Sequence, residues 1–414
     1  MRKIYFIICI AFFSLLSCTS GMEEPRTPLN EGQKEEVGLL SREDVILFAD
    51  QYMQALTGKT RSVRKVADVN LVSLSMKDGA KTRGGNIGDE VTYLVNYQNE
   101  EGFVLMSGNS SSCILLAISD EANLNMNDTI ENKALAGILE SYIGILPPGT
   151  VVPRDSITIN LDTPPLLPKY VRKWGQNEPF NSEVPLEKNS TRHCAVGCGP
   201  LAAAMIMAYC EWPNSYKGYT FDWSAIKNGT ADNQIAMLLK FIGDKDAMYT
   251  TYGGANGSGT SISKIPDGFA ALNYNFGNGF LSYPSSIPGF SQINNRPLNP
   301  IEHWTYTRPA YMIGEMDYNG GRVGHAWIVD GRLTIHHDPN AYKGEAPEDD
   351  IYLHCVWGHY GKGNGYFLVR KNGIGGDSYK TDPQDGAYPG YTFSPSTYDW
   401  TYNLKFNQTI VPNK

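Results

Sequence analysis

The sequence predicts an α+β protein built of two domains. Apolar residues at helical spacing after residue 44 are followed by runs of β-forming residues, which indicates a first unit of packed helix and strands. A second unit is indicated by the run from Leu201 to Tyr209, which is rich in strong helix formers and apolar on every side, as in a buried helix. The stretch from Pro147 to Pro168 is rich in proline and is typical of an extended linker between the two units.

The first domain is expected over residues 39–160. Ser41-Arg-Glu-Asp44 offers a capping box for its first helix. Three β-rich runs follow, at 91–97, 103–107 and 113–119, and a second helix is expected over 132–143. We expect no catalytic residue in this domain, because every histidine of the chain comes later and Cys113 lies in an apolar strand.

A glycine-flanked cysteine opens the buried helix of the second domain. Cys198 precedes Leu201, so its sulfur lies where the unsatisfied N–H groups and the helix dipole favour a thiolate. A thiolate in such a place is a candidate nucleophile. Gly197 and Gly199 would let a substrate backbone come close, and the freed amides would face a developing oxyanion. The alternative is a structural cysteine on a core helix.

The N-terminus has the pattern of an export signal. Basic residues at positions 2 and 3 precede an apolar run from Ile4 to Leu16 that is too short for a stable membrane helix. Leu15-Leu16-Ser17-Cys18 resembles a bacterial lipobox, so residues 1–18 are expected to be a lipoprotein signal that ends at a lipidated Cys18. An ordinary signal with a chance cysteine is the alternative. Residues 19–38 are acidic and poor in apolar residues, as in a tether.

Composition excludes some classes of function. A net charge of −8 without a basic patch argues against nucleic acid as a partner. Five cysteines remain after Cys9 and Cys18 are set aside, and this odd number indicates at least one free thiol. The loose cluster of His193, Cys194, Cys198 and Cys210 lacks paired Cys-x2-Cys spacing, so we expect no metal site and no cofactor.

The nucleophile segment resembles that of the streptopain-like cysteine peptidases. The resemblance rests on Ala195 to Pro213 and on four further segments in family order: 173–176, 252–261, 324–331 and 354–358. Residues 102–125 are similar to the propeptide of the same zymogens. The resemblance implies a papain-like, two-lobed catalytic domain over residues 161–414, preceded by a small inhibitory α+β prodomain.

The general base must be one of seven histidines. His325 is expected at the head of a short apolar strand that begins after glycines, and a residue there projects at a sheet edge, near loops and clefts. The resemblance assigns the base to this histidine; a histidine that only caps the strand is the alternative. No residue identifies itself as the group that orients the imidazole, and Asp330 is a weak candidate.

The resemblance implies further site residues. Gln176 corresponds to the glutamine that shares an oxyanion hole with the Cys198 amide, and Trp357 to the tryptophan that packs against the catalytic histidine. Ser258 and Gly324 correspond to positions beside a bound peptide. The family commonly has Asn-Trp-Gly-Trp around Trp357, whereas this chain has Val356-Trp-Gly-His359, which affects the histidine's orientation and the shape of the pocket.

Together these observations predict a lipid-anchored cysteine endopeptidase made as a zymogen. Its partners would be protein or peptide substrates, its own prodomain as an intramolecular inhibitor, and a membrane through the lipid. We expect it at a bacterial outer membrane or cell surface, with release after maturation left open. Maturation is expected between residues 153 and 170, with Arg154 and Lys169 as candidate cleavage points. The alternatives are a surface lipoprotein that binds host protein or glycan with an inert Cys198, and an acyltransferase on the same fold.

Overall fold

A computed structural model describes residues 39–58, 64–72, 91–109, 112–126, 132, 135–136, 138–139, 142, 157–254, 257–282, 307–318, 321–338, 349–370, 373–374 and 405–413. The chain from Val37 to Lys414 forms one compact unit. The predicted signal, lipobox and tether lie outside the described residues. In the part of the chain that the structure describes, no helix is long and apolar enough to cross a membrane.

The first predicted helix is confirmed as α1 (Arg42–Thr57). Ser41 is its N-cap, and the Ser41 hydroxyl accepts a hydrogen bond from the Asp44 amide at 3.1 Å, as the capping box predicts. The helix ends at Gly58, which has a φ of +66°. One face of α1 is buried, and it contributes to the domain core through Val45, Ala49, Tyr52, Met53 and Leu56.

Four antiparallel strands pack with α1. They are β1 (Val66–Val72), β2 (Val91–Tyr97), β3 (Phe103–Asn109) and β4 (Ser112–Ser119). The short helix η1 (Gln98–Glu100) joins β2 to β3. Strand β1 has no counterpart among the predicted strands, because none of its residues is fully buried and its sequence lacks a clear apolar pattern. Residues 135, 136, 138 and 139, within the second predicted helix, are helical.

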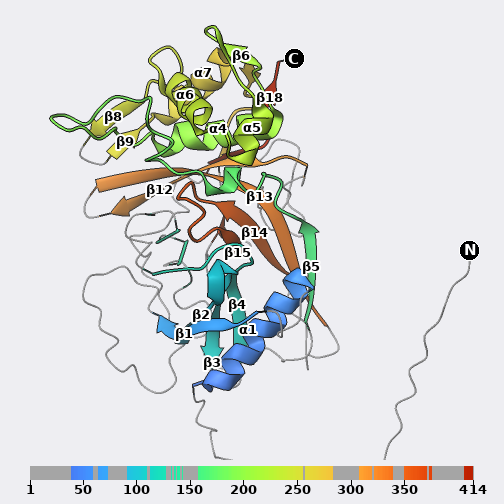
Figure 1. Ribbon diagram of the computed structural model, residues 1–414. Coiled ribbons are helices and arrows are strands. Elements are labelled where there is room, and N and C mark those ends of the chain that lie inside the picture. The colour runs from blue at the N-terminus through green and yellow to red at the C-terminus, as the bar shows by residue number, and fades with distance from the viewer. Residues whose placement is uncertain are drawn as a thin grey trace, which may run out of the picture. The chain divides into compact units, whose positions relative to one another are not determined.

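One large sheet runs through both predicted domains (Figure 1). Its strand order is β1-β2-β3-β4-β15-β14-β13-β12-β17-β11, with β5 paired to β13 and β16 to β15. The added strands are β5 (Ile157–Thr163), β11 (Leu281–Ser282), β12 (Ala310–Tyr318), β13 (Gly321–His337), β14 (Asp350–Val356), β15 (Gly365–Arg370), β16 (Gly373–Ile374) and β17 (Lys405–Asn407). The junction between the domains is the β4–β15 pair, where Ile118 opposes Tyr366. The domain boundaries themselves stay a prediction.

The helices of the second predicted domain gather together, above the β12–β13 part of the sheet in Figure 1. They are α4 (Cys198–Cys210), α5 (Trp223–Asn228), α6 (Asp232–Gly243) and α7 (Ile265–Ala271), with the short helices η2 (Val171–Lys173) and η3 (Ile262–Lys264). Two-stranded ribbons join them: β6 (Ser215–Tyr216) with β7 (Tyr219–Thr220), β8 (Thr251–Gly254) with β9 (Gly257–Gly259), and β10 (Tyr274–Asn275) with β18 (Val411–Pro412).

Helix α4 is buried from Gly199 to Ala208, which confirms the apolar helix that the sequence predicts. It belongs to one hydrophobic core together with α5, α6 and α7. A second core joins α1 and the strands of the first domain to Trp327 and Trp357 of the second predicted domain. Strand β13, which carries His325, contributes to both cores, and it contacts α4, which carries Cys198.

Candidate active site

Cys198 is the first residue of α4, where the sequence places it. Its N-cap, Gly197, has a φ of +87°, which residues with a side chain rarely adopt. A Cβ on Gly197 would lie 3.4 Å from the backbone oxygen of Ser258, so the β9 backbone runs close to the start of the helix. The Tyr311 hydroxyl donates to the carbonyl of Gly199 at 3.0 Å and holds the first turn from the sheet side.

His325 lies within β13 rather than at the head of a short strand, which corrects the expectation from the sequence. The hairpin formed by β12 and β13 stays paired to the end, where Tyr318 opposes Gly321, so the glycines before the histidine continue the strand. His325 opposes Gly314 of β12. Gly324, expected beside a substrate backbone, pairs with Glu315 and is exposed.

Cys198 and His325 are brought together and share a side-chain hydrogen bond. Burial by itself raises the pKa of the Cys198 thiol, but the hydrogen bond and charge of His325 outweigh it and hold that pKa below its usual value. The backbone amides of Ala326 and Gly199 act in the same direction. Burial lowers the pKa of His325, while the bond and charge of Cys198 raise it, with a net rise. The pair therefore favours thiolate and imidazolium.

The third group at the site is a backbone carbonyl. Nε2 of His325 donates to the carbonyl oxygen of Trp357 at 3.0 Å. The imidazole also stacks on the Trp327 indole, with ring centroids 6.3 Å apart and planes 12° apart. The indole of Trp357 is buried against Trp327 at 5.7 Å and donates from Nε1 to the carbonyl of Gly363 at 2.9 Å. Trp357 thus contacts the histidine through its backbone.

Asp330, the weak candidate for orienting the histidine, is engaged elsewhere. Its carboxylate accepts from the Leu167 amide at 2.9 Å and lies 2.6 Å from Nδ1 of His354.

Asn364 is a residue that the sequence reasoning missed. Its Oδ1 accepts from the Trp357 amide at 3.1 Å, and its Nδ2 donates to the carbonyl of Arg172 at 2.9 Å. Asn364 therefore fixes the segment whose carbonyl holds His325.

Gln176 lies beside the nucleophile segment, because its carbonyl accepts from the Val196 amide at 2.9 Å. Its side chain is partly buried. Tyr360, which the sequence reasoning also missed, supports this segment: a Cβ on Gly175 would fall 2.4 Å from the Tyr360 ring, and the Tyr360 hydroxyl accepts from the Asn177 amide at 2.9 Å. The oxyanion role of Gln176 stays a prediction.

Ser258 lies in the β8–β9 ribbon, next to the start of α4. Its hydroxyl accepts from the Gly253 amide at 3.3 Å, which closes the ribbon. Strands β8 and β9 therefore form a short antiparallel ribbon on the Cys198 side of the site. Its contact with substrate stays a prediction.

Comparison with known proteins agrees with this geometry. Residues 174–367 match the peptidase C10 family, and residues 39–143 match the Spi protease inhibitor family. The chain thus joins a Spi inhibitor domain to a peptidase C10 domain. It is a streptopain-like cysteine peptidase in zymogen form, with an inhibitor domain ahead of a papain-like catalytic domain.

Relatives of this C10 peptidase are distant in sequence. It is 24% identical to streptopain of Streptococcus pyogenes over 391 residues, covering 83% of this chain and 90% of the relative. A Prevotella intermedia prointerpain A fragment is 18% identical with a TM-score of 0.45, covering 84% of this chain and all of that one. Active interpain A from the same organism is 19% identical with a TM-score of 0.34, covering 50% and 85%.

The two residues at which this C10 peptidase departs from the Asn-Trp-Gly-Trp pattern, Val356 and His359, both pack against apolar or aromatic neighbours. Val356 is fully buried in the helical core, where an apolar side chain packs well. The ring of His359 lies edge-on to Tyr360 at 6.0 Å.

Among the described residues, no group of three or more His, Cys, Asp or Glu side chains is arranged to hold a metal ion, and the five cysteines described are all free.

Proposed function

We propose that this protein is an exported, lipid-anchored zymogen whose catalytic domain hydrolyses peptide bonds of proteins through Cys198 and His325. The observation that carries the proposal is the hydrogen bond between these two side chains at the N-terminus of a buried helix. A thiolate held by an imidazolium at a helix start is an activated nucleophile.

Acylation uses both members of the pair. The Cys198 sulfur attacks the scissile carbonyl carbon, and the resulting tetrahedral intermediate carries a negative charge on oxygen. The C–N bond then breaks, and the imidazolium of His325 gives its proton to the leaving amine. The part of the substrate that is N-terminal to the broken bond remains on Cys198 as a thioester.

Deacylation returns the enzyme to its starting state. His325, now neutral, takes a proton from water as the water attacks the thioester carbonyl, and the Cys198 thiolate leaves as the carboxylic acid is released. In both steps the Cys198 amide and the Gln176 side chain would hold the oxyanion, a role supported by the pairing of the Gln176 carbonyl with Val196.

The inhibitor-like domain and the N-terminal sequence support the rest of the proposal. The domain over residues 39–143 would keep the enzyme inactive until it is removed. The lipobox ending at Cys18 supports export and anchoring at a bacterial outer membrane or cell surface. Incorporation of labelled palmitate by the parent in a bacterial host, and its loss in Cys18→Ala, is the expected result; equal labelling of both would overturn the lipid anchor.

A gel time course tests the peptidase. Residues 19–414 would be incubated with casein under reducing conditions, beside Cys198→Ala and His325→Ala. His336→Ala is the matched control. His336 lies on β13, as His325 does, but it is partly exposed and pairs with Asp349. We expect the parent and His336→Ala to lose the prodomain and degrade casein, while the two site variants remain intact. Loss of casein in Cys198→Ala would contradict the proposal.

A further inference from the structure

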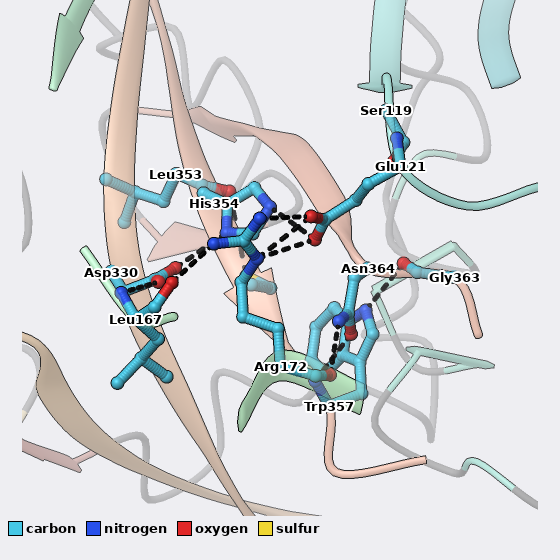
Figure 2. Close-up of polar contacts among 11 residues, drawn as sticks. Ser119, Glu121, Leu167, Arg172, Asp330, Leu353, His354, Trp357, Gly363 and Asn364 are labelled. Atoms are coloured by element: carbon cyan, nitrogen blue, oxygen red, sulfur yellow. Dashed lines mark hydrogen bonds and ion pairs between the residues drawn. The ribbon is translucent and has the colours of Figure 1, made fainter. Parts of the chain in front are cut away.

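Four charged side chains form a buried cluster where the inhibitor-like domain meets the catalytic domain (Figure 2). Glu121, just beyond β4, makes a two-point contact with Arg172, with Nε 2.9 Å and 3.1 Å from its two oxygens. The Glu121 carboxylate also lies 3.3 Å from Nε2 of His354. On its other side the His354 ring meets Asp330, with Nδ1 and Oδ1 2.6 Å apart.

The cluster is almost closed to solvent. The exposed fractions are 12% for Arg172, 11% for Glu121, 2% for His354 and 0% for Asp330. Two carboxylates thus face one guanidinium and one imidazole, and the charges balance only when His354 is protonated. Burial by itself lowers the pKa of His354, but the two carboxylates, Asp330 first, raise it to about 9.

Other ionisable groups surround these four. Tyr366 of β15 places its ring edge-on to His354 at 4.9 Å, and burial raises the pKa of its hydroxyl well above the usual value. Asp120 adds negative charge near Arg172 and Tyr366. Cys355, beside His354 on β14, has its thiol pKa raised by burial and by Asp330, so it adds no charge.

Glu121 comes from the inhibitor-like domain, and its partners come from the catalytic side. The strand that precedes it, β4, pairs with the catalytic strand β15 through Ile118 and Ala117. The same segment therefore supplies a strand to the edge of the catalytic sheet and a carboxylate to the buried pocket. Strand pairing gives a general attachment, whereas a two-point Arg–carboxylate contact is directional and specific.

We propose that Arg172 and His354 form a carboxylate-binding site of the catalytic domain, that Glu121 occupies it in the zymogen, and that acid weakens this attachment of the prodomain. The inference rests on the proposed function in that it treats residues 39–143 as a removable inhibitor. The pocket is the feature that selects this prodomain, and Glu121 is the residue that it recognises.

The direction of the pH effect follows from the two groups. Burial raises the pKa of Glu121, but His354 and Arg172 outweigh it and hold that pKa at about 2, below the ordinary value of 4.5. The ionised Glu121 carboxylate therefore stabilises docking of the prodomain above pH 4.5. This stabilisation is lost as the pH falls from 4.5 toward 2 and the carboxylate becomes protonated. His354 acts at the other end of the pH range: its contribution to the stability of the folded protein is complete below its ordinary pKa of 6.5 and is lost as the pH rises through about 9. Only the part of this shift that Glu121 causes belongs to docking, because Asp330 remains beside His354 in the catalytic domain.

The first test uses full-length protein with Cys198→Ala, which prevents processing. Glu121→Gln keeps the shape of the side chain and removes its charge. Glu100→Gln is the matched control, because Glu100 is an exposed carboxylate of the same domain. We expect Glu121→Gln to lower the melting temperature at pH 7 by several degrees, to flatten the loss of stability between pH 5 and pH 3, and to lower the pKa of His354 measured by NMR. Glu100→Gln should match the parent.

A second test measures maturation of the active zymogen. Residue 121 leaves with the prodomain, so the mature enzymes from the parent and from Glu121→Gln are identical in sequence. We expect Glu121→Gln to mature at least about tenfold faster at pH 7, because one partner of a buried charge pair has been removed. The peptidase activity of the two mature enzymes should be equal.

The outcomes separate this inference from the proposed function. If casein is not cleaved by any variant, the peptidase proposal fails, yet melting and NMR of the Cys198→Ala protein still decide the role of Glu121. The double variant Glu121→Gln with Arg172→Gln guards against a general folding defect. If the two residues act as a pair, the double variant should lose less melting temperature than the two single variants lose together. An unchanged melting temperature and an unchanged His354 pKa in Glu121→Gln would overturn the inference.

Discussion

The carbonyl oxygen of Trp357 accepts a hydrogen bond from Nε2 of His325 at 3.0 Å. A carbonyl can only accept, so Nε2 carries a proton, and Nδ1 is left as the nitrogen that exchanges a proton with the thiol. The orienting group of this site is thus part of the backbone. It cannot be removed by a side-chain substitution, but the residues that hold it can be changed.

Asn364→Ala tests how the Trp357 carbonyl is held in place. Loss of the amide frees the Trp357 N–H and the Arg172 carbonyl, so the Trp357 segment loses two fixed hydrogen bonds. We expect kcat to fall about tenfold or more with a smaller change in KM, because the histidine is misplaced while the substrate cleft remains. Steady-state kinetics on a peptide substrate would measure both constants.

The matched control is Asn228→Ala, an exposed asparagine at the end of α5. It should leave kcat unchanged. The account of Asn364 would be contradicted if the two alanine variants had the same kcat and the same pH profile.

Gly358→Ala tests how closely the Trp357 turn approaches α4. Gly358 has a φ of +73°, and a Cβ there would lie 2.8 Å from Cδ2 of Leu201. Gly218→Ala is a control for the backbone strain alone, because its φ is +81° and a Cβ would meet nothing within 4 Å. We expect Gly218→Ala to cost about 1–2 kcal/mol of unfolding free energy, and Gly358→Ala about 1–3 kcal/mol more. Equal losses in urea unfolding would argue against the close approach.

The mature N-terminus is expected before residue 157. Strand β5 pairs with β13, and the amides of Leu166 and Leu167 both bond to Asp330, so this segment is built into the catalytic sheet. A cut after Lys169 would release that segment, whereas a cut after Arg154 would leave it in place. N-terminal sequencing of the processed enzyme decides between the two, and a start at Tyr170 would contradict this prediction.

Gln176→Ala is expected to lower kcat by about 100-fold, the usual effect of losing one oxyanion donor. KM should change little, because the backbone of this segment is held by Val196 and Tyr360 rather than by the glutamine side chain. A variant with parental kcat would show that the oxyanion is held by other donors.

Local sequence signals predict several features of this fold correctly. The capping box at Ser41 and the position of Cys198 at a helix start follow from short-range preferences, which act within one turn of helix. The family resemblance identifies His325 as the base, whereas its expected place at the head of a strand is wrong, because the glycine-containing sequence before it pairs with β12.

The remaining features depend on contacts between distant parts of the chain. The Trp357 carbonyl has no signature in the sequence, because every residue has a carbonyl. Asn364 and Tyr360 gain their roles only when the turn after β14 folds back onto the segment around Arg172. The cluster of Glu121, Arg172 and His354 likewise exists only because β4 pairs with β15.

The pH dependence of Cys198 alkylation tests the central claim most directly. The zymogen and its His325→Ala variant would be treated with iodoacetamide across the pH range, and mass spectrometry of the peptide containing Cys198 would separate it from the other thiols. We predict that Cys198 in the parent titrates below the ordinary thiol value of 9.0 and that His325→Ala shifts its pKa upward. Identical titration of Cys198 in both proteins, at or above 9.0, would contradict a thiolate–imidazolium pair at this site.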